Sequence, residues 1–164
     1  MTNSLGKGIF LAILTVFLAT LIWVIAPCNQ AASKNLTKIV VGNKEVFVEL
    51  AVTAKERGRG LQFRTSLPED HGMLFIFPTE KLPSFWMEDT YIPLSVAFIK
   101  KSGLITQIEE MEPGSHDRHT SRENTKYALE MNAGWFKRNN IHVGDMVTIP
   151  LIADTTHDKV KQAH

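Results

Sequence analysis

The sequence predicts a mainly β fold: a single small β-sandwich or barrel-like domain with one or two short helices, preceded by an N-terminal apolar helix. Three observations predict it. Apolar residues after residue 37 recur in short runs, many of period two, turn-forming residues separate these runs, and an uncharged apolar segment occupies residues 8–26. The boundaries follow as a membrane segment at 1–28, a linker at 29–36, one β domain at 37–152 and a disordered tail at 153–164.

The N-terminal segment is predicted to enter or cross a membrane. Residues 8–26 carry no charge, and their number is close to the about 20 apolar residues that a helix needs to span a bilayer. Lys7 precedes them, so the positive-inside bias keeps that end in the cytoplasm. An uncleaved anchor, a cleaved signal and a lipid attached to Cys28 all remain open. Each places the following domain in the cell envelope: membrane-anchored, or secreted or periplasmic if the segment is cleaved.

The β domain is predicted to begin with a hairpin and a short helix. Residues 46–52 alternate between two faces, as in a half-buried strand, and the apolar residues 39–41 precede them across a turn at Gly42-Asn43. Thr53 and Glu56 have the spacing of a capping box at a helix start. Two glycines in the next four residues keep that helix short.

Further strands follow, separated by turns. The run at 73–77 is apolar at every position and stops at Pro78, which predicts a short strand buried on both faces. Asn132 is expected to cap a short turn or helix that carries Trp135 and Phe136. The remaining strands are predicted at 92–99, 104–111, 127–131 and 146–151.

Composition narrows the functional classes. The 18 basic and 17 acidic residues give a net charge of +1, so nothing in the composition indicates a nucleic-acid partner. The single cysteine excludes an intramolecular disulfide scaffold and any multi-cysteine metal centre. No nucleotide-binding loop or nucleophile motif is present, so no cofactor and no catalytic residue is assigned. Arg57, Arg59 and Arg64 lie close together, but Glu56 and Glu69 dilute them, which favours an ordinary solvated face.

Several stretches resemble a known family. They are Ala54-Lys-Glu-Arg-Gly-Arg-Gly-Leu-Gln-Phe-Arg64, Gly72-Met-Leu-Phe-Ile-Phe-Pro78, Ser84-Phe-Trp-Met-Glu-Asp-Thr-Tyr-Ile-Pro-Leu94, Tyr127-Ala-Leu-Glu-Met-Asn-Ala-Gly134 and Val143-Gly-Asp145. Together they resemble the uncharacterised family called domain of unknown function 192, DUF192. The resemblance implies a mainly β domain, often exported, with no established activity. The chain departs from the family pattern at Glu88-Asp89, where Lys-Asn is usual, at Ser95, where Asp is usual, and at Lys100, where Asp is common.

A candidate ligand-binding patch follows Pro83. Trp86 could stack against a sugar or another ring, while Glu88, Asp89 and Thr90 supply hydrogen bonds. The alternative is structural: the neighbours of Trp86 pack in the core, and Glu88-Asp89 form a turn.

Glu130 is a second candidate, because it lies among apolar residues of a predicted strand. Paired with Arg64, it would be either an acid with a displaced pKa or a structural link between a loop and the sheet. In a binding module, Arg64 and Glu130 would frame the patch around Trp86.

These features favour a tethered, non-enzymatic module that binds a small ligand or an envelope protein. Two alternatives stay open. One is an envelope hydrolase with a carboxylate pair drawn from Glu88, Asp89, Glu110 and Glu130. The other is a protein that handles metal, such as copper, through His116, His119 and a methionine.

Overall fold

The structure is a computed structural model that describes residues 36–150. These residues form a mainly β domain with two short helices, which confirms the fold class at that level. The predicted membrane segment, linker and tail lie outside the described residues, apart from Leu36. The elements are β1 (Thr37–Val41), β2 (Lys44–Ala51), α2 (Ala54–Arg59), β3 (His71–Lys81), β4 (Ser84–Phe85), β5 (Leu94–Ile99), β6 (Ile105–Met111), β7 (His119–Thr120), β8 (Thr125–Asn132), α3 (Trp135–Arg138) and β9 (Val147–Thr148).

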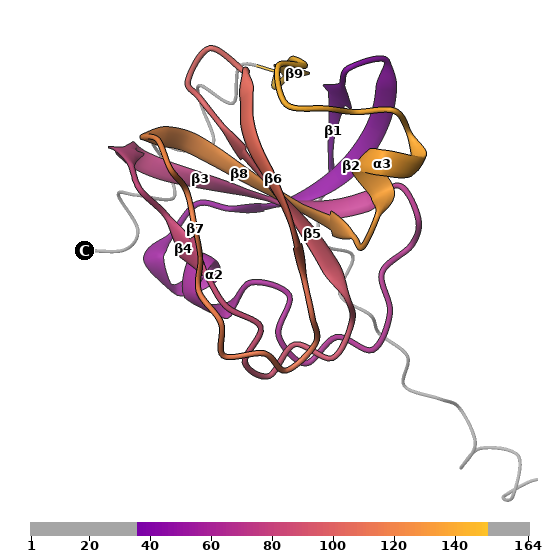
Figure 1. The fold of residues 1–164 in the computed structure, drawn as a ribbon, viewed down its shortest axis with the longest axis vertical. Helices are drawn as coiled ribbons and strands as arrows, with labels where there is room; N and C mark the ends of the chain where they lie inside the picture. The colour runs from indigo at the N-terminus through magenta and orange to yellow at the C-terminus, as the bar shows by residue number, and fades with distance from the viewer. Residues whose placement is uncertain (1–35, 151–164) are drawn as a thin grey trace, which may run out of the picture. The chain divides into compact units, whose positions relative to one another are not determined.

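The main sheet has seven strands in the order β6-β5-β8-β3-β2-β1-β9. All neighbours are antiparallel except β2 and β3, which run parallel because helix α2 lies in the crossover between them. The sheet curls into a half-barrel (Figure 1), and its two edges meet where Leu104, before β6, bridges Met146, before β9. The small strands β4 and β7 pair separately as a two-stranded ribbon.

Both faces of the sheet are buried, and each has its own core. Along β3, Leu74 and Ile76 point to one core, and Met73, Phe75 and Phe77 point to the other. This confirms that the all-apolar run at 73–77 is a strand covered on both sides. The first core includes the α3 aromatics and Val147 of β9, whereas the second includes residues that follow α2 and β4.

The predicted hairpin and helix start are confirmed. Strands β1 and β2 pair across the turn, where Gly42 has a positive φ of 59°. Thr53 caps α2 with both hydrogen bonds of the capping box. The helix ends after Arg59, at Gly60, whose φ of 51° favours glycine.

Four local expectations differ from the structure. Strand β3 does not stop at Pro78 but continues to Lys81 across a register irregularity, which tolerates a residue without an N–H. Asn132 does not cap α3, because Gly134 occupies that position and the Asn132 amide donates to the carbonyls of Leu67 and Pro68 instead. The last strand spans only Val147–Thr148. The ribbon of β4 and β7 was not predicted.

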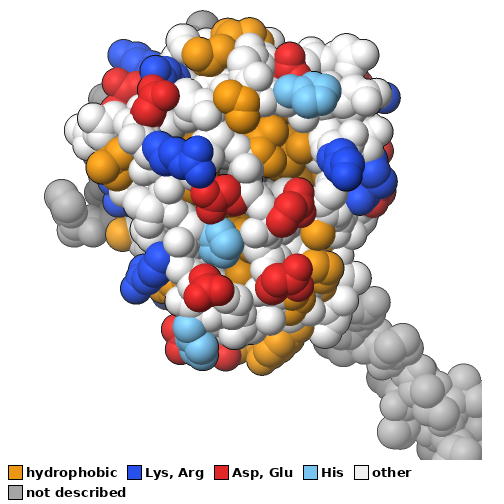
Figure 2. All heavy atoms as spheres, viewed as in Figure 1, with side chains coloured by type: hydrophobic (Ala, Val, Ile, Leu, Met, Phe, Trp, Pro, Cys, Tyr) orange, Lys and Arg blue, Asp and Glu red, His pale blue; other side chains and the backbone are white. Residues whose placement is uncertain are grey.

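The surface gives no sign of a polyanion-binding face in the view of Figure 2, where acidic, basic and histidine side chains are interspersed. Within residues 36–150, no helix combines the length and apolarity that a bilayer crossing requires.

Candidate functional site

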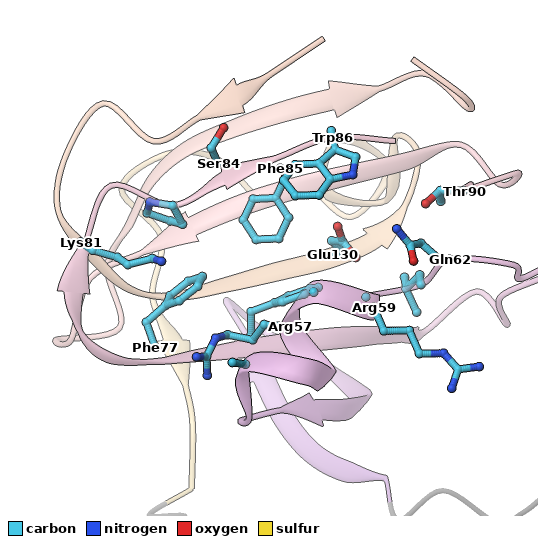
Figure 3. A pocket seen from close by; sticks show the side chains of 16 residues that line it. Arg57, Arg59, Gln62, Phe77, Lys81, Ser84, Phe85, Trp86, Thr90 and Glu130 are labelled. Carbon is cyan, nitrogen blue, oxygen red and sulfur yellow. The ribbon is translucent and has the colours of Figure 1, made fainter. Parts of the chain in front are cut away.

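A pocket of about 320 Å³ lies between helix α2 with its following loop and the segment that leads into and follows β4. In Figure 3, Phe85 and Trp86 lie on one side of this pocket and the side chains of α2 on the other, with Glu130 between them. The lining combines four aromatic side chains, three cations and four other polar groups: Phe75, Phe77, Phe85 and Trp86; Arg57, Arg59 and Lys81; and Gln62, Ser84, Thr90 and Glu130. An apolar cavity with a few convergent polar groups is the usual form of a small-molecule site.

Helix α2 is fastened to the sheet and so fixes one wall. The hydroxyl of Thr53 accepts a hydrogen bond from the Glu56 amide at 3.1 Å, and the Glu56 carboxylate accepts one from the Thr53 amide at 2.8 Å. The guanidinium of Arg57 donates to the carbonyl of Ile76 on β3 at 3.0 Å and to that of Val52. These contacts hold a six-residue helix in place, although its intrinsic stability is low at that length.

Glu130 provides the polar group at the base of the pocket. It lies on the inner strand β8, with Met73 of β3 and Val96 of β5 directly opposite it in register. Only 5% of the residue is exposed, and its Oε2 has no hydrogen-bond partner among the described residues. Burial raises the pKa of Glu130 from 4.5 to about 8, because desolvation penalises the charged form. The carboxyl is therefore largely neutral at pH 7, and it can both donate and accept a hydrogen bond.

Aromatic rings form the wall opposite α2. Phe85 packs edge-on against Phe75 with ring centroids 4.9 Å apart, so it is held by the core beneath it. Trp86, the next residue, is 38% exposed at the pocket mouth. The guanidinium of Arg118 lies 4.3 Å from the centroid of its ring. One face of the indole is thus already covered by a cation.

The rim is positively charged. Arg57 and Lys81 both lie near the Phe77 ring, at 5.7 and 5.0 Å from its centroid, and Arg59 is exposed at the end of α2. Burial lowers the pKa of Arg57, against the raising effect of Glu56, but arginine stays protonated at physiological pH. Glu130 is the one acidic residue among the described lining residues. The pocket therefore combines a cationic rim with a carboxyl that is neutral at pH 7.

Comparison with known proteins identifies the family. Residues 37–149 match the DUF192 family, which is described as an "Uncharacterized ACR". The chain belongs to the DUF192 family. No curated protein matches it.

Two solved structures resemble this DUF192 chain. One is a proposed transcription regulator from Sinorhizobium meliloti 1021, with 36% identity, a TM-score of 0.68, and coverage of 71% of this chain and 95% of that one. The other is a protein of unknown function from Novosphingobium aromaticivorans DSM 12444, with 28% identity, a TM-score of 0.69, and coverage of 74% and 90%.

The DUF192 structure brings three of the six expected ligand residues together: Trp86, Thr90 and Glu130 all line the pocket. Glu88 and Asp89 do not line it, because they are exposed in the turn after Met87. Thr90 closes this turn through its amide, which donates to the Met87 carbonyl at 3.0 Å. Met87 itself is buried in the core.

Arg64 does not pair with Glu130, as the sequence had suggested. Its Nη2 lies 2.5 Å from Oε1 of Glu49 on β2, and Arg64 is not among the residues that line the pocket. The alternation at 46–52 predicts that Glu49 lies on the solvent-facing side of a half-buried strand. For that reason the sequence favours Glu130, not Glu49, as the partner of Arg64. In the folded domain that face is covered at Glu49, which is only 8% exposed, whereas Phe47 on the same face is 40% exposed.

Five polar or charged lining residues are not among the site residues predicted from the sequence. They are Arg57, Arg59, Gln62, Lys81 and Ser84. The two arginines lie in the noted basic stretch, and the capping box at Thr53 could have placed them on a helix packed against the sheet. Nothing in the sequence pattern places Lys81 in the site, because the strand at 73–77 is predicted to end at Pro78.

Two of the acids considered for a hydrolase, Glu110 and Glu130, do not face each other. Glu110 is opposite Ser95 in register, and its carboxylate accepts hydrogen bonds from the Ser95 hydroxyl at 2.6 Å and the Gly134 amide at 2.9 Å. Glu130 lies in register with the neighbouring Val96, so the two carboxylates point to opposite faces of the sheet.

The two histidines considered for metal binding are in different surroundings. His119 Nδ1 lies 2.9 Å from the Glu109 carboxylate, whereas His116 is exposed in the preceding loop. Across residues 36–150, no three or more His, Cys, Asp or Glu side chains are grouped in a way that could hold a metal ion. Cys28 lies outside the described residues.

Proposed function

We propose that this protein is a non-enzymatic module of the cell envelope that binds a small ligand in the pocket beside Trp86. Residues 8–26 would tether it to the membrane, or direct its export if they are cleaved, with the β domain outside the cytoplasm. The observation that carries the proposal is the pocket whose lining includes Glu130, a buried carboxyl with one oxygen that has no hydrogen-bond partner among the described residues.

Several features support binding rather than catalysis. Among the described residues a single carboxyl lines the pocket, whereas glycoside hydrolysis of the usual kind needs two that flank the bond. No nucleophile motif is found in the sequence. An unidentified envelope protein is the other partner that an exposed Trp86 would suit, and nucleic acid is not expected from the balanced charge. The name of the Sinorhizobium relative makes DNA binding a useful counter-test.

The test is to identify small molecules that leave the full-length protein when it is denatured after purification from its native membranes. We expect mass spectrometry to find a molecule with wild-type protein that is lost in Trp86→Ala. Tyr91→Ala is the matched control, because Tyr91 is 59% exposed and does not line the pocket, so this variant should keep the molecule. Equal recovery from all three proteins, or from none, would overturn the pocket assignment.

A further inference from the structure

We propose that the pocket selects a small, ring-containing anion that also carries an uncharged hydrogen-bonding group such as an amide. The anionic group would lie at the rim that carries Arg59 and Lys81, and the amide would lie against Glu130. This inference rests on the proposed function, because it names the class of ligand for the same pocket.

The base of the pocket accounts for the uncharged group. Glu130 lines the cavity and is only 5% exposed. Its Oε2 has no hydrogen-bond partner among the described residues. A buried polar atom without a hydrogen bond is costly, so a ligand that satisfies it gains affinity. A protonated carboxyl offers a donor and an acceptor side by side, and an amide offers the reciprocal pair. An amide therefore matches this base better than a purely apolar group.

The walls account for the ring. Phe75, Phe77 and Phe85 line the cavity together with Trp86, and flat rings pack well against such surfaces. A volume of about 320 Å³ is at the lower end for small-molecule sites, which extend from about 300 to 1,000 Å³. That size suits a ligand of one or two rings.

The rim determines the sign of the charge. A buried glutamate surrounded by aromatic rings would otherwise be a reasonable site for an ammonium ion. Here three cations share the lining with that one acid, and two of them, Arg59 and Lys81, are exposed at the mouth. An ammonium ligand would have to approach these cations, whereas an anion is attracted by them. The charge distribution therefore favours an anion.

The experiment compares three probes that share a ring and an amide and differ in charge: 4-carbamoylbenzoate, benzamide and 4-(aminomethyl)benzamide, which is an ammonium ion at neutral pH. Binding to the full-length protein is followed by saturation-transfer NMR and by the emission of Trp86, with Trp86→Ala as the reference for the other tryptophans. We expect the benzoate to bind about five- to tenfold more tightly than benzamide, since two exposed cations contribute modestly, and the ammonium probe to bind most weakly.

Variants separate the roles of the base and the rim. Glu130→Gln keeps an uncharged donor and acceptor and should retain binding of benzamide, whereas Glu130→Leu should lose it. Arg59→Gln combined with Lys81→Gln should remove the preference for the benzoate, so that the benzoate and benzamide bind with similar affinity. Thermal unfolding of each variant checks that the domain remains folded.

Three results would overturn the inference. They are tightest binding of the ammonium probe, loss of benzamide binding in Glu130→Gln with that variant folded, and binding of none of the probes. The first leaves the pocket as a binding site for a cation, so the proposed function would stand. The co-purification experiment tests that function independently of these probes.

Discussion

Glu49 and Glu130 lie in one row of the main sheet, on either side of Met73, and their environments differ in one respect. Glu49 has Arg64 at 2.5 Å, whereas Glu130 Oε2 has no hydrogen-bond partner among the described residues. Glu49 is therefore paired with a cation and has a structural role. Glu130 lines a cavity and has no such pairing within residues 36–150. The difference between them is the basis for the first two predictions.

Arg64→Ala should destabilise the domain, because it leaves the Glu49 carboxylate nearly buried without its cation. The two side chains are 26% and 11% exposed, so solvent screens part of the effect, and we expect a loss of about 1–3 kcal/mol in the free energy of unfolding. Denaturant unfolding measures it. Adding Glu49→Gln should recover part of the loss. Lys38→Ala, which breaks an ion pair with more than half of each side chain exposed, is the matched control and should cost less than about 1 kcal/mol. Equal losses would contradict this role for Arg64.

Glu130→Gln should change how stability depends on pH. The pKa of this glutamate is 4.5 when it is exposed to water, as in the unfolded chain, and about 8 in the folded domain. Between these values the folded protein holds a proton that the unfolded chain has released. Stability therefore falls as pH rises through this window, by at most about 1.4 kcal/mol per unit, and levels off above pH 8. Glutamine cannot titrate, so the variant should lose this slope.

Other charged groups lie near that face of the sheet: Glu49 with Arg64, Glu109 with His119, and the rim cations Arg57, Arg59 and Lys81. All of them are kept in Glu130→Gln. The comparison of thermal unfolding curves between pH 5.5 and 7.5 is therefore made against Glu88→Gln, an exposed acid outside the pocket. Identical slopes in wild type and Glu130→Gln would show that the buried carboxyl does not titrate in this range.

Local patterns predicted most strands because each depends on neighbouring residues. The alternation at 46–52 and the apolar run at 73–77 both became strands of the main sheet. The parallel pairing of β2 with β3 and the closure between Leu104 and Met146 could not be predicted, since they depend on contacts far apart in the chain. The unpredicted ribbon has the same origin, because each of its strands has only two residues.

The candidate site was predicted in part for the same reason. Glu130 was identified because a carboxylate within an apolar strand is unusual whatever the strand order. The surroundings of Glu130 could not be predicted, because the sequence does not say whether Arg64 pairs with Glu130 or with Glu49. Glu88 and Asp89 were misplaced because a polar residue beside Trp86 in the chain need not share its pocket. Their turn directs them to solvent, and Asp89 has a positive φ of 55°.

Ser95→Asp should destabilise this chain. Ser95 is fully buried, and its hydroxyl donates to Glu110 and accepts a hydrogen bond from the Gly134 amide. An aspartate would place a second acid against Glu110 and remove the donor, with an expected cost of about 2–4 kcal/mol. Glu110→Gln in the same chain should relieve much of it, because the amide can donate to the new carboxylate. Thermal unfolding of the single and double variants measures this, and an equally unstable double variant would contradict it.

Gly72→Ala should destabilise the sheet at the strand that carries Glu130. A Cβ at this position would meet the Met131 sulfur at 2.5 Å and would lie even closer to the Glu130 carbonyl oxygen, a backbone atom that cannot move without shifting β8. We expect a loss of about 1–3 kcal/mol in the free energy of unfolding, together with altered Trp86 emission because the base of the pocket moves. Gly58→Ala is the matched control. A Cβ there meets nothing within 4 Å, and alanine favours the helix, so this variant should gain about 0.5–1 kcal/mol. Urea unfolding measures both changes. A Gly72→Ala protein as stable as wild type would show that β8 can shift to make room for the methyl group at little cost.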